Sequence, residues 1–335
     1  MPLLTNPTLF APSTHAAAAP GAVLSRAALR EYAANGYVAI PDLCSAGDLA
    51  QIRTTLLEFF RRQVGRDEGN QFDMLGLDVD ASAARQPQIL KPSVFAPELL
   101  RTEYFDKLES AARQLLGPDA QFSFDHSILK PARSAVATPW HQDEANHNHK
   151  YLRYRQVSFW MALQDTPVEA GCMRYIPGSD RGPLLPHHWL DDDPRIHAIE
   201  CRAENFDESL AVAVPAAAGS CIAHDGRTLH SALPNVSGAG RFAYIVAFTS
   251  PPVLARQARA FTLVSNDTAN LRRRTRWLRH GGFLIYGMRR LRRPLRSSPR
   301  ALWRKLRLIV RAAYLRVRAG RRAAPSTLSR ERQNP

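Results

Sequence analysis

The chain has 335 residues, of which 45% are hydrophobic and 22% charged, the composition of a globular protein with a full hydrophobic core. Its four cysteines lie far apart without CxxC spacing, so we expect reduced thiols rather than a disulfide framework. The formal net charge of +15 arises at the C-terminus, because residues 271–335 contain 21 Lys and Arg residues and a single acidic residue, Glu331.

Residues 1–24 are rich in Ala, Pro and Thr and are expected to lack fixed structure. No Lys or Arg precedes an apolar run there, so we do not expect a secretory signal. No segment of the chain approaches the roughly 18 consecutive apolar residues of a membrane-spanning helix. We therefore expect a cytoplasmic protein, with peripheral contact to the inner face of a membrane as one alternative, and not an integral membrane protein.

Helical patterns come first in the chain. Residues 25–36 carry apolar residues at helical spacing and end on Gly36, which predicts a helix with a glycine C-cap. The sequence YVAIP then predicts a short buried strand ended by Pro41, and an apolar stripe predicts a second helix from Ser45. Residues 64–98 contain many Gly, Asp and Pro residues and are predicted to form a loop region that folds over a site.

Short apolar runs dominate after Pro118, separated by turn sequences such as PGSD and NVSGAG. They are FSFDHSIL, VSFWMAL, GCMRYIP, AVAVP, GSCIAHD and RFAYIVAF. Many short strands with Gly and Pro turns favour an antiparallel sandwich or barrel, hence a mainly β fold with flanking helices. We therefore expect an unstructured segment at 1–24, a catalytic domain at 25–265 and a basic, partly helical tail at 266–335.

The sequence TPWHQDEANHNHK contains a candidate metal site. His141 and Asp143 are two residues apart, so on an extended strand both side chains point to one side. His230 is the best candidate for a third ligand. Two His and one carboxylate on one face of iron(II) leave positions for a bidentate 2-oxo acid and dioxygen, whereas structural zinc usually takes four protein ligands.

Other histidines were weighed against these ligands. We interpret His147 and His149 as parts of a solvated loop beside the site, and His224 as the main rival of His230. Arg241 opens the last strand, and a guanidinium can hold a carboxylate through two parallel hydrogen bonds. We therefore expect Arg241 to bind the distal carboxylate of 2-oxoglutarate, the alternative being a surface arginine paired with an acid.

The ordered motifs resemble the phytanoyl-CoA dioxygenase family. The matching sequences are HQD at 141–143, Trp160 in VSFWMALQD, GCMRYIPGS at 171–179, HSALPN at 230–235 and Arg241. EYAANGYVAIPDL also resembles the opening helix and strand of that family, and the resemblance extends from about residue 25 to residue 251. HxD alone is a weak signal, but the ordered set is specific. One departure is Asp180, where the family often has histidine.

The resemblance implies a double-stranded β-helix, or jelly-roll, core with the metal in its mouth. It implies that His141, Asp143 and His230 bind Fe(II), that Arg241 anchors 2-oxoglutarate, and that O2 is the oxidant. Lys130, Gln142 and Trp160 match positions near the cosubstrate, although Trp160 could instead belong to the core. Because Asp143 is a carboxylate, hydroxylation is favoured over halogenation, for which relatives carry a small residue at this position.

The tail contains a candidate amphipathic helix at residues 300–320. On a helical wheel its apolar residues form one arc, which Arg and Lys residues border. The residues of the arc are Trp303, Leu306, Ile309, Val310, Ala313, Tyr314 and Val317. This pattern is typical of a helix on an anionic membrane surface. Packing on the parent domain explains it equally well, and nucleic acid is a weaker third interpretation because it requires no ordered apolar face.

Together these features predict an Fe(II)- and 2-oxoglutarate-dependent dioxygenase that hydroxylates a small organic or lipid-like substrate and releases succinate and CO2. The alternative is a non-catalytic jelly-roll protein that docks on a membrane or polyanion through its basic tail. The sequence does not indicate an oligomeric state.

Overall fold

The computed structural model describes residues 23–147, 151–257 and 267–294, together with residues 263, 265, 303, 306–311 and 314. His149 and all but the last two residues of the segment predicted to be unstructured lie outside these ranges. Most of the candidate helix at 300–320 does too. The domain boundaries expected from the sequence therefore stay predictions.

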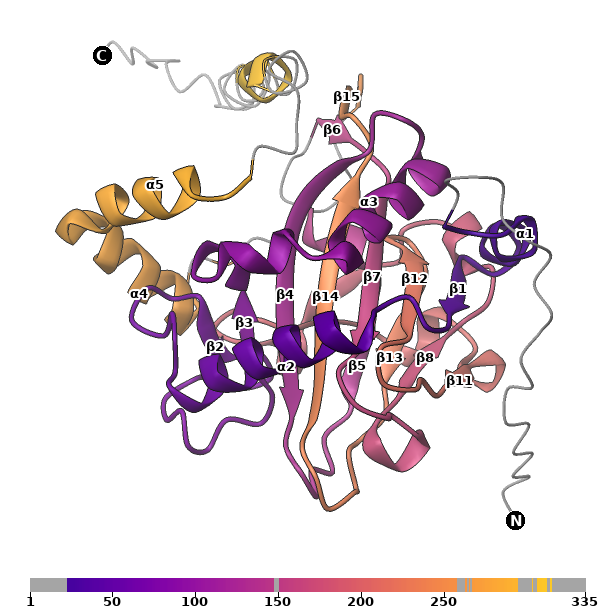
Figure 1. Cartoon of the computed structure of the whole chain (residues 1–335), viewed down its shortest axis with the longest axis horizontal. Coiled ribbons are helices and arrows are strands. Elements are labelled where there is room, and N and C mark those ends of the chain that lie inside the picture. Colours follow the sequence, from indigo (N-terminus) through magenta and orange to yellow (C-terminus); the bar gives the residue numbers. More distant parts are fainter. Residues whose placement is uncertain are drawn as a thin grey trace, which may run out of the picture.

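Two antiparallel sheets form the core (Figure 1). The larger sheet has the order β1-β12-β7-β14-β4-β3-β2. Its strands are β1 (Tyr37–Ile40), β2 (Gln71–Asp73), β3 (Pro87–Leu90), β4 (Gln121–Lys130), β7 (Gln156–Ala162), β12 (Cys221–Asp225) and β14 (Arg241–Thr249). The smaller sheet has the order β11-β8-β13-β5, with β5 (Thr138–His141), β8 (Met173–Tyr175), β11 (Val212–Val214) and β13 (His230–Ala232). Two further pairs join β9 (His187–Trp189) to β10 (Ile199–Cys201) and β6 (Leu152–Arg153) to β15 (Val253–Leu254). This is the expected jelly-roll core.

Strand β7 shows why the larger sheet is buried on both faces. Val157, Phe159 and Met161 point to one face and pack in the core formed with the helices. Trp160 and Ala162 point to the other face and pack against residues of the smaller sheet. Because successive residues of a strand alternate between faces, an almost continuous apolar sequence is required here.

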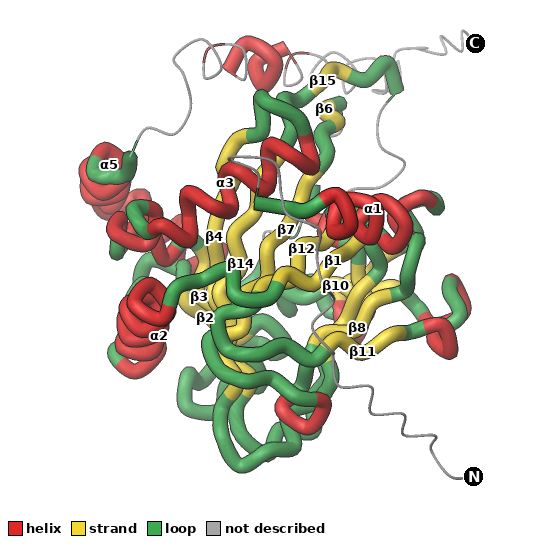
Figure 2. The backbone as a smooth tube through the Cα atoms, turned by 45° about the vertical axis from the view of Figure 1, so that its right-hand side comes forward, coloured by secondary structure: helices red, strands yellow, loops and turns green. Residues whose placement is uncertain are grey.

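Helices α1 (Arg26–Asn35), α2 (Ala46–Arg61) and α3 (Glu103–Leu116) cover the outer face of the larger sheet (Figure 2). The predicted boundaries of the first helix are confirmed: the Ser25 hydroxyl accepts a hydrogen bond from the Ala28 amide, and Gly36 is left-handed with φ of 76°. Ser45 caps α2 in the same way by accepting from the Asp48 amide. Tyr37 then opens β1 directly after Gly36.

The prediction of a loop at residues 64–98 is wrong in part. Strands β2 and β3 lie in this region and extend the larger sheet, with β3 paired to β4. They have three and four residues, too few to show the alternation that identifies a strand in a sequence. The pairing of β3 with β4, and of β2 with β3, is a tertiary property, and it makes this region part of the wall of the central cavity.

The C-terminal residues form helices α4 (Ala269–Trp277) and α5 (Phe283–Leu291), joined by a π-helical turn at Leu278–Gly282. Figure 1 shows both helices beside β2 and β3, at the edge of the larger sheet. Within the described ranges, no helix combines the length and the apolar character needed to cross a bilayer.

Candidate active site

A cavity of about 410 Å³ opens between the two sheets. Both sheets line it, with Trp160, Ile245 and Arg241 from the larger sheet and Met173 and His230 from the smaller one. This position corresponds to the mouth of the jelly roll, where the resemblance places a metal.

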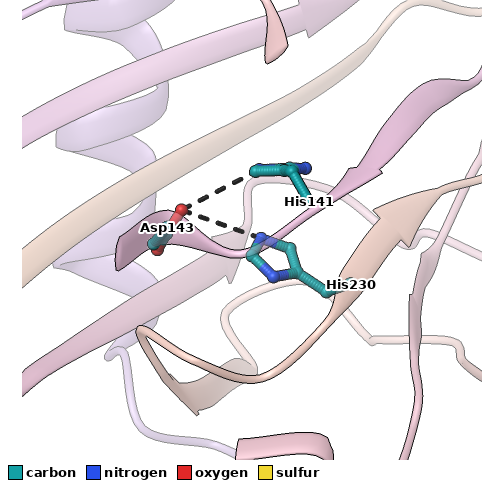
Figure 3. Close-up of side chains that lie close together, drawn as sticks. All are labelled: His141, Asp143 and His230. Carbon is teal, nitrogen blue, oxygen red and sulfur yellow. Dashed lines mark ion pairs between the residues drawn. The ribbon is translucent and has the colours of Figure 1, made fainter. Parts of the chain in front are cut away.

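Three of the residues selected from the sequence meet in this cavity (Figure 3). His141 is the last residue of β5, and Asp143 begins the short 3-10 helix η3 (Asp143–Asn146) directly after it. His230 opens β13 and lies opposite His141 in the register of the smaller sheet. One ligand atom from each residue lies within 4.8 Å of the other two, so the group could hold a metal ion.

The two imidazoles are oriented by the backbone. His141 Nδ1 lies 2.9 Å from the Pro139 carbonyl oxygen, and His230 Nδ1 lies 2.8 Å from the Thr228 carbonyl oxygen. A carbonyl can only accept, so each Nδ1 carries the proton and donates it, which leaves Nε2 with a free lone pair. Each Nε2 points at Asp143, at 3.8 Å and 3.9 Å from Oδ1.

The Asp143 carboxylate is oriented by the opposite sheet. Its Oδ2 accepts a hydrogen bond from the Ser158 hydroxyl at 2.7 Å and a longer one from Gln156 Nε2 at 3.3 Å. His224 Nε2 lies 3.4 Å from the same oxygen, while its Nδ1 lies 3.2 Å from the Tyr175 hydroxyl. With Oδ2 engaged in this way, Oδ1 is left facing the two imidazoles.

The electrostatics favour the protonation states that metals bind. Burial lowers the pKa of His141, and burial with the neighbouring imidazoles holds the pKa of His230 well below its usual value. Burial alone would raise the pKa of Asp143, but the hydrogen bond from His224 and the nearby imidazoles outweigh it and hold that pKa well below the ordinary range. Neutral imidazoles beside an ionised carboxylate are the forms that coordinate a cation.

Arg241 lines the same cavity and is almost completely buried, at 3% exposure. Its Nη2 donates to the Gly171 carbonyl at 3.0 Å, and its guanidinium lies 5.3 Å from the centre of the Trp160 ring. Its Nε has no hydrogen-bond partner among the residues that the structure describes, and burial lowers the pKa of this residue to about 10. A buried cation with an unused donor fits an anionic ligand, and a carboxylate matches the guanidinium geometry.

Two other candidates lie outside the cavity lining. The Lys130 amine donates to the Val136 carbonyl at 3.0 Å, and burial lowers its pKa to about 6. Lys130 lies opposite Arg241 in the register of β4 and β14. The Gln142 side chain is fully buried and bonds the backbone of Arg227 and Leu185. The Gln142 side chain points away from the side that carries His141 and Asp143, as expected for the middle of three residues in an extended backbone.

The structure shows where the alternative histidines, His224 and His147, lie. His224 lines the cavity as a partner of Asp143, on β12. His147 Nε2 instead lies 3.0 Å from Gln156 Oε1, and its imidazole is buried rather than solvated as expected. Sequence analysis missed Ser158 and Gln156 as partners of Asp143. The sequence signal for them is weak, since both simply occupy alternate positions of an apolar strand.

Comparisons with known proteins agree with this geometry. A model of the phytanoyl-CoA dioxygenase family matches residues 32–243. Among curated proteins, the probable alpha-ketoglutarate-dependent hypophosphite dioxygenase of Stutzerimonas stutzeri is 23% identical over 66% of this chain and 77% of its own length. The peroxisomal phytanoyl-CoA dioxygenase of Bos taurus is 24% identical over 56% of this chain. The matched segment spans 57% of that second protein.

Solved structures include a relative with its cosubstrate. EvdO2 from Micromonospora carbonacea var. aurantiaca, in complex with 2-oxoglutarate, is 31% identical, with a TM-score of 0.61 over 71% of this chain and 95% of EvdO2. The non-haem alpha-ketoglutarate-dependent carbocyclase SnoK of nogalamycin biosynthesis is 25% identical, with a TM-score of 0.53 over 70% of this chain and 87% of SnoK.

Proposed function

Because this chain belongs to the phytanoyl-CoA dioxygenase family and is a 2-oxoglutarate-dependent dioxygenase, we propose that it hydroxylates an apolar organic or lipid-like substrate. We assign the catalytic domain to residues 25–265. Fe(II) is held by His141, Asp143 and His230, and Arg241 binds 2-oxoglutarate. One observation carries the assignment: the two free Nε2 atoms and Asp143 Oδ1 converge at one point of a cavity that a buried arginine also lines.

Bound Fe(II) would activate O2, the oxidant, so that one oxygen atom oxidises 2-oxoglutarate to succinate and CO2 and the other oxidises the substrate. The protein holds the ligands in place. The Pro139 and Thr228 carbonyls keep both imidazoles in the tautomer that exposes Nε2, and Ser158 keeps Asp143 Oδ1 turned toward them. Three protein ligands on one side leave the other positions free for the cosubstrate and dioxygen.

Arg241 holds the distal carboxylate of 2-oxoglutarate through its guanidinium, and Trp160 keeps that guanidinium in position through the cation–π contact. Lys130 lies opposite Arg241 on β4 and its amine bonds the Val136 carbonyl, so we assign it a supporting role beside Arg241 rather than a direct contact with the cosubstrate. Gln142 acts indirectly, because its amide bonds to the backbone at Arg227 and Leu185 hold the turn between His141 and Asp143.

The substrate class follows from the remaining lining. Its apolar members include Met74, Leu90, Phe124, Ile128, Met173, Trp189, Ile196, Ile199, Ile245, Leu263 and Leu271. Burial lowers the pKa of His126 and His197 to about 4, so both are neutral at neutral pH. Among the lining residues outside the assigned metal and cosubstrate groups, Lys91 is the single charged side chain. An apolar molecule with at most one anionic group fits this cavity.

The Asp143 carboxylate occupies the position that a halide would need, so hydroxylation is favoured over halogenation, with desaturation and ring closure as the alternatives that the same ligand set allows. The non-catalytic alternative is not favoured, since relatives of this chain are alpha-ketoglutarate-dependent and phytanoyl-CoA dioxygenases.

Succinate release from 2-oxoglutarate by the anaerobically iron-loaded protein, measured after O2 is admitted, tests the proposal. Asp143→Ala and His230→Ala should abolish turnover and iron-dependent binding of 2-oxoglutarate. Arg241→Lys keeps the charge but loses the planar fork, and should raise KM for 2-oxoglutarate by about tenfold or more.

Arg174→Lys is the matched control for Arg241→Lys. Arg174 also lies over a tryptophan, at 4.8 Å from the Trp140 ring, but it does not line the cavity between the sheets. Equal effects of the two substitutions on KM would contradict the role of Arg241. Wild-type protein that binds no 2-oxoglutarate in the presence of Fe(II) would overturn the proposed function.

A further inference from the structure

Helices α4 and α5 form a compact hairpin. Gly281 takes a left-handed conformation with φ of 89°, and a Cβ at Gly282 would collide with the Trp277 ring. The Trp277 and Tyr286 rings meet edge to face at 6.5 Å, and the Arg274 guanidinium lies over the Tyr286 ring at 5.2 Å. These contacts hold α5 in a fixed orientation relative to α4.

The hairpin is attached to the catalytic domain through arginines. Arg273 on α4 pairs with the buried Asp78, and Arg289 on α5 pairs with Glu68 at 3.0 Å. Arg293, just after α5, lies 3.9 Å from the fully buried Asp125. The side of the hairpin that faces the domain is thus basic, and its partners are acidic.

The outward side of α5 is apolar. Its exposed residues are Phe283, Leu284, Ile285, Met288 and Leu291, with exposed fractions of 59%, 61%, 42%, 59% and 86%. Five large apolar side chains within nine residues exceed the scattered exposed apolar residues of an ordinary protein surface. Burying each of them favours association with an apolar phase.

Positive charge surrounds this apolar side. Arg290 and Arg292 are exposed at the end of α5; on a helical wheel Arg290 borders the apolar residues and Arg292 lies between Met288 and Ile285. Arg276 and Arg279 are exposed on α4 and the turn. Asp267 is the single acidic residue from 267 to 294. An apolar face bordered by free arginines complements a bilayer whose headgroups are anionic. Among the described residues after α5, Trp303, Leu306, Val310 and Tyr314 are also exposed.

The hairpin is also continuous with the wall of the cavity. Leu263, Ser265 and Thr268 lead into α4 and line the cavity between the sheets, as does Leu271 within α4. Helix α5 thus begins twelve residues after Leu271, at the end of a continuous segment that starts in the cavity wall.

We propose that the outward face of α5, formed by Phe283, Leu284, Ile285, Met288 and Leu291, docks this protein on the surface of an anionic lipid bilayer. The contact is peripheral: the apolar side chains insert below the headgroups, and the flanking arginines pair with lipid phosphates. It differs from the contact expected from the sequence, which placed the membrane helix at residues 300–320. It does not depend on the proposed substrate.

Co-sedimentation of the full-length protein with vesicles tests this proposal. Vesicles of phosphatidylcholine alone are compared with vesicles of phosphatidylcholine and phosphatidylglycerol. The test variant is the double substitution Leu284→Glu and Met288→Glu. The control variant, Leu210→Glu and Val236→Glu, introduces the same charge at apolar residues of similar exposure, 58% and 63%, that lie outside α5.

Wild type and the control variant should bind the anionic vesicles, and salt should weaken that binding. The test variant should bind at least about 100-fold more weakly, because each apolar side chain that no longer inserts lowers the affinity for the vesicles about tenfold or more. Equal binding of the two variants, or preference for neutral vesicles, would overturn the proposal.

Light scattering addresses the other ways of covering α5. A wild-type dimer that ignores vesicles and becomes monomeric in the test variant would mean that a second copy covers this face. A wild-type monomer that ignores anionic vesicles would mean that another part of the chain covers it. Both results would overturn membrane docking. Neither readout requires turnover, so failure here is distinct from failure of the proposed chemistry.

Discussion

Ser158→Ala should weaken Fe(II) binding by about 10- to 100-fold, because partners that orient a metal ligand typically contribute this much to affinity. The Ser158 hydroxyl donates to Asp143 Oδ2 at 2.7 Å from a position that is 2% exposed. A hydrogen bond to a charged group contributes about 1.5–3 kcal/mol, and each 1.4 kcal/mol corresponds to a factor of ten in binding. The remaining donor, Gln156 at 3.3 Å, and His224 at 3.4 Å are too distant to compensate fully.

The assay is anaerobic titration of the metal-free protein with Fe(II), followed by succinate formation at low and at saturating iron. Loss of activity should be pronounced at low iron and largely relieved at saturating iron, since the three proposed ligands are unchanged. Ser127→Ala is the matched control. Ser127 is fully buried on β4 of the same sheet, which β14 separates from β7, and its hydroxyl donates at 2.8 Å to the Ala243 carbonyl rather than to Asp143.

Two results would refute the reasoning. If Ser158→Ala and Ser127→Ala altered Fe(II) affinity equally, the effect would reflect a general loss of packing. If Ser158→Ala bound Fe(II) as wild type does, the carboxylate would be oriented without the hydroxyl.

Three further predictions concern neighbouring features. Trp160→Phe should raise KM for 2-oxoglutarate by about three- to tenfold, because the Arg241 guanidinium loses the strongest cation–π partner; an unchanged KM in steady-state assays would contradict this. Burial lowers the pKa of Lys130 to about 6, so above that pH its amine is neutral in the folded protein but protonated in the unfolded chain. The free energy of unfolding, measured in urea, should therefore rise between about pH 6 and pH 10 by up to about 1.4 kcal/mol per pH unit. Lys130→Met should flatten that rise, and an unchanged slope would exclude this cause. Gly69→Ala should loosen α4, because Gly69 has a φ of 69° and a Cβ there would collide with the Asn270 carbonyl. The expected result is faster proteolysis within residues 267–294, with proteolysis of the core unchanged.

Much of the fold could be predicted because its signals are local. The caps at Ser25 and Gly36 act on the residues beside them, and an alternating or continuous apolar run identifies a strand wherever that strand pairs. Strands β2 and β3 escaped prediction because β3 forms by pairing with β4, more than thirty residues away, and β2 forms by pairing with β3. Short strands are stabilised by their neighbours rather than by their own composition.

The candidate ligands could be selected from the sequence for a similar reason. His141 and Asp143 are two residues apart, and an extended backbone alone turns both to one side. His230 and Arg241 required the resemblance, because nothing in their local sequence reveals that β13 pairs with β5 or that β14 opens into the cavity. Their spatial convergence is a consequence of how the two sheets face each other.

The sequence by itself determined the chemistry that the chain can carry: two histidines, one carboxylate and one arginine in a specific order, and a C-terminus dense in arginine. Tertiary structure alone decided how these groups are used. It placed Ser158 and His224 against Asp143, and it turned Arg289 inward to Glu68 while Leu284 faces outward on α5. The physical reason is that hydrogen bonding, burial and ion pairing act through distances in space, and strands remote in sequence set those distances.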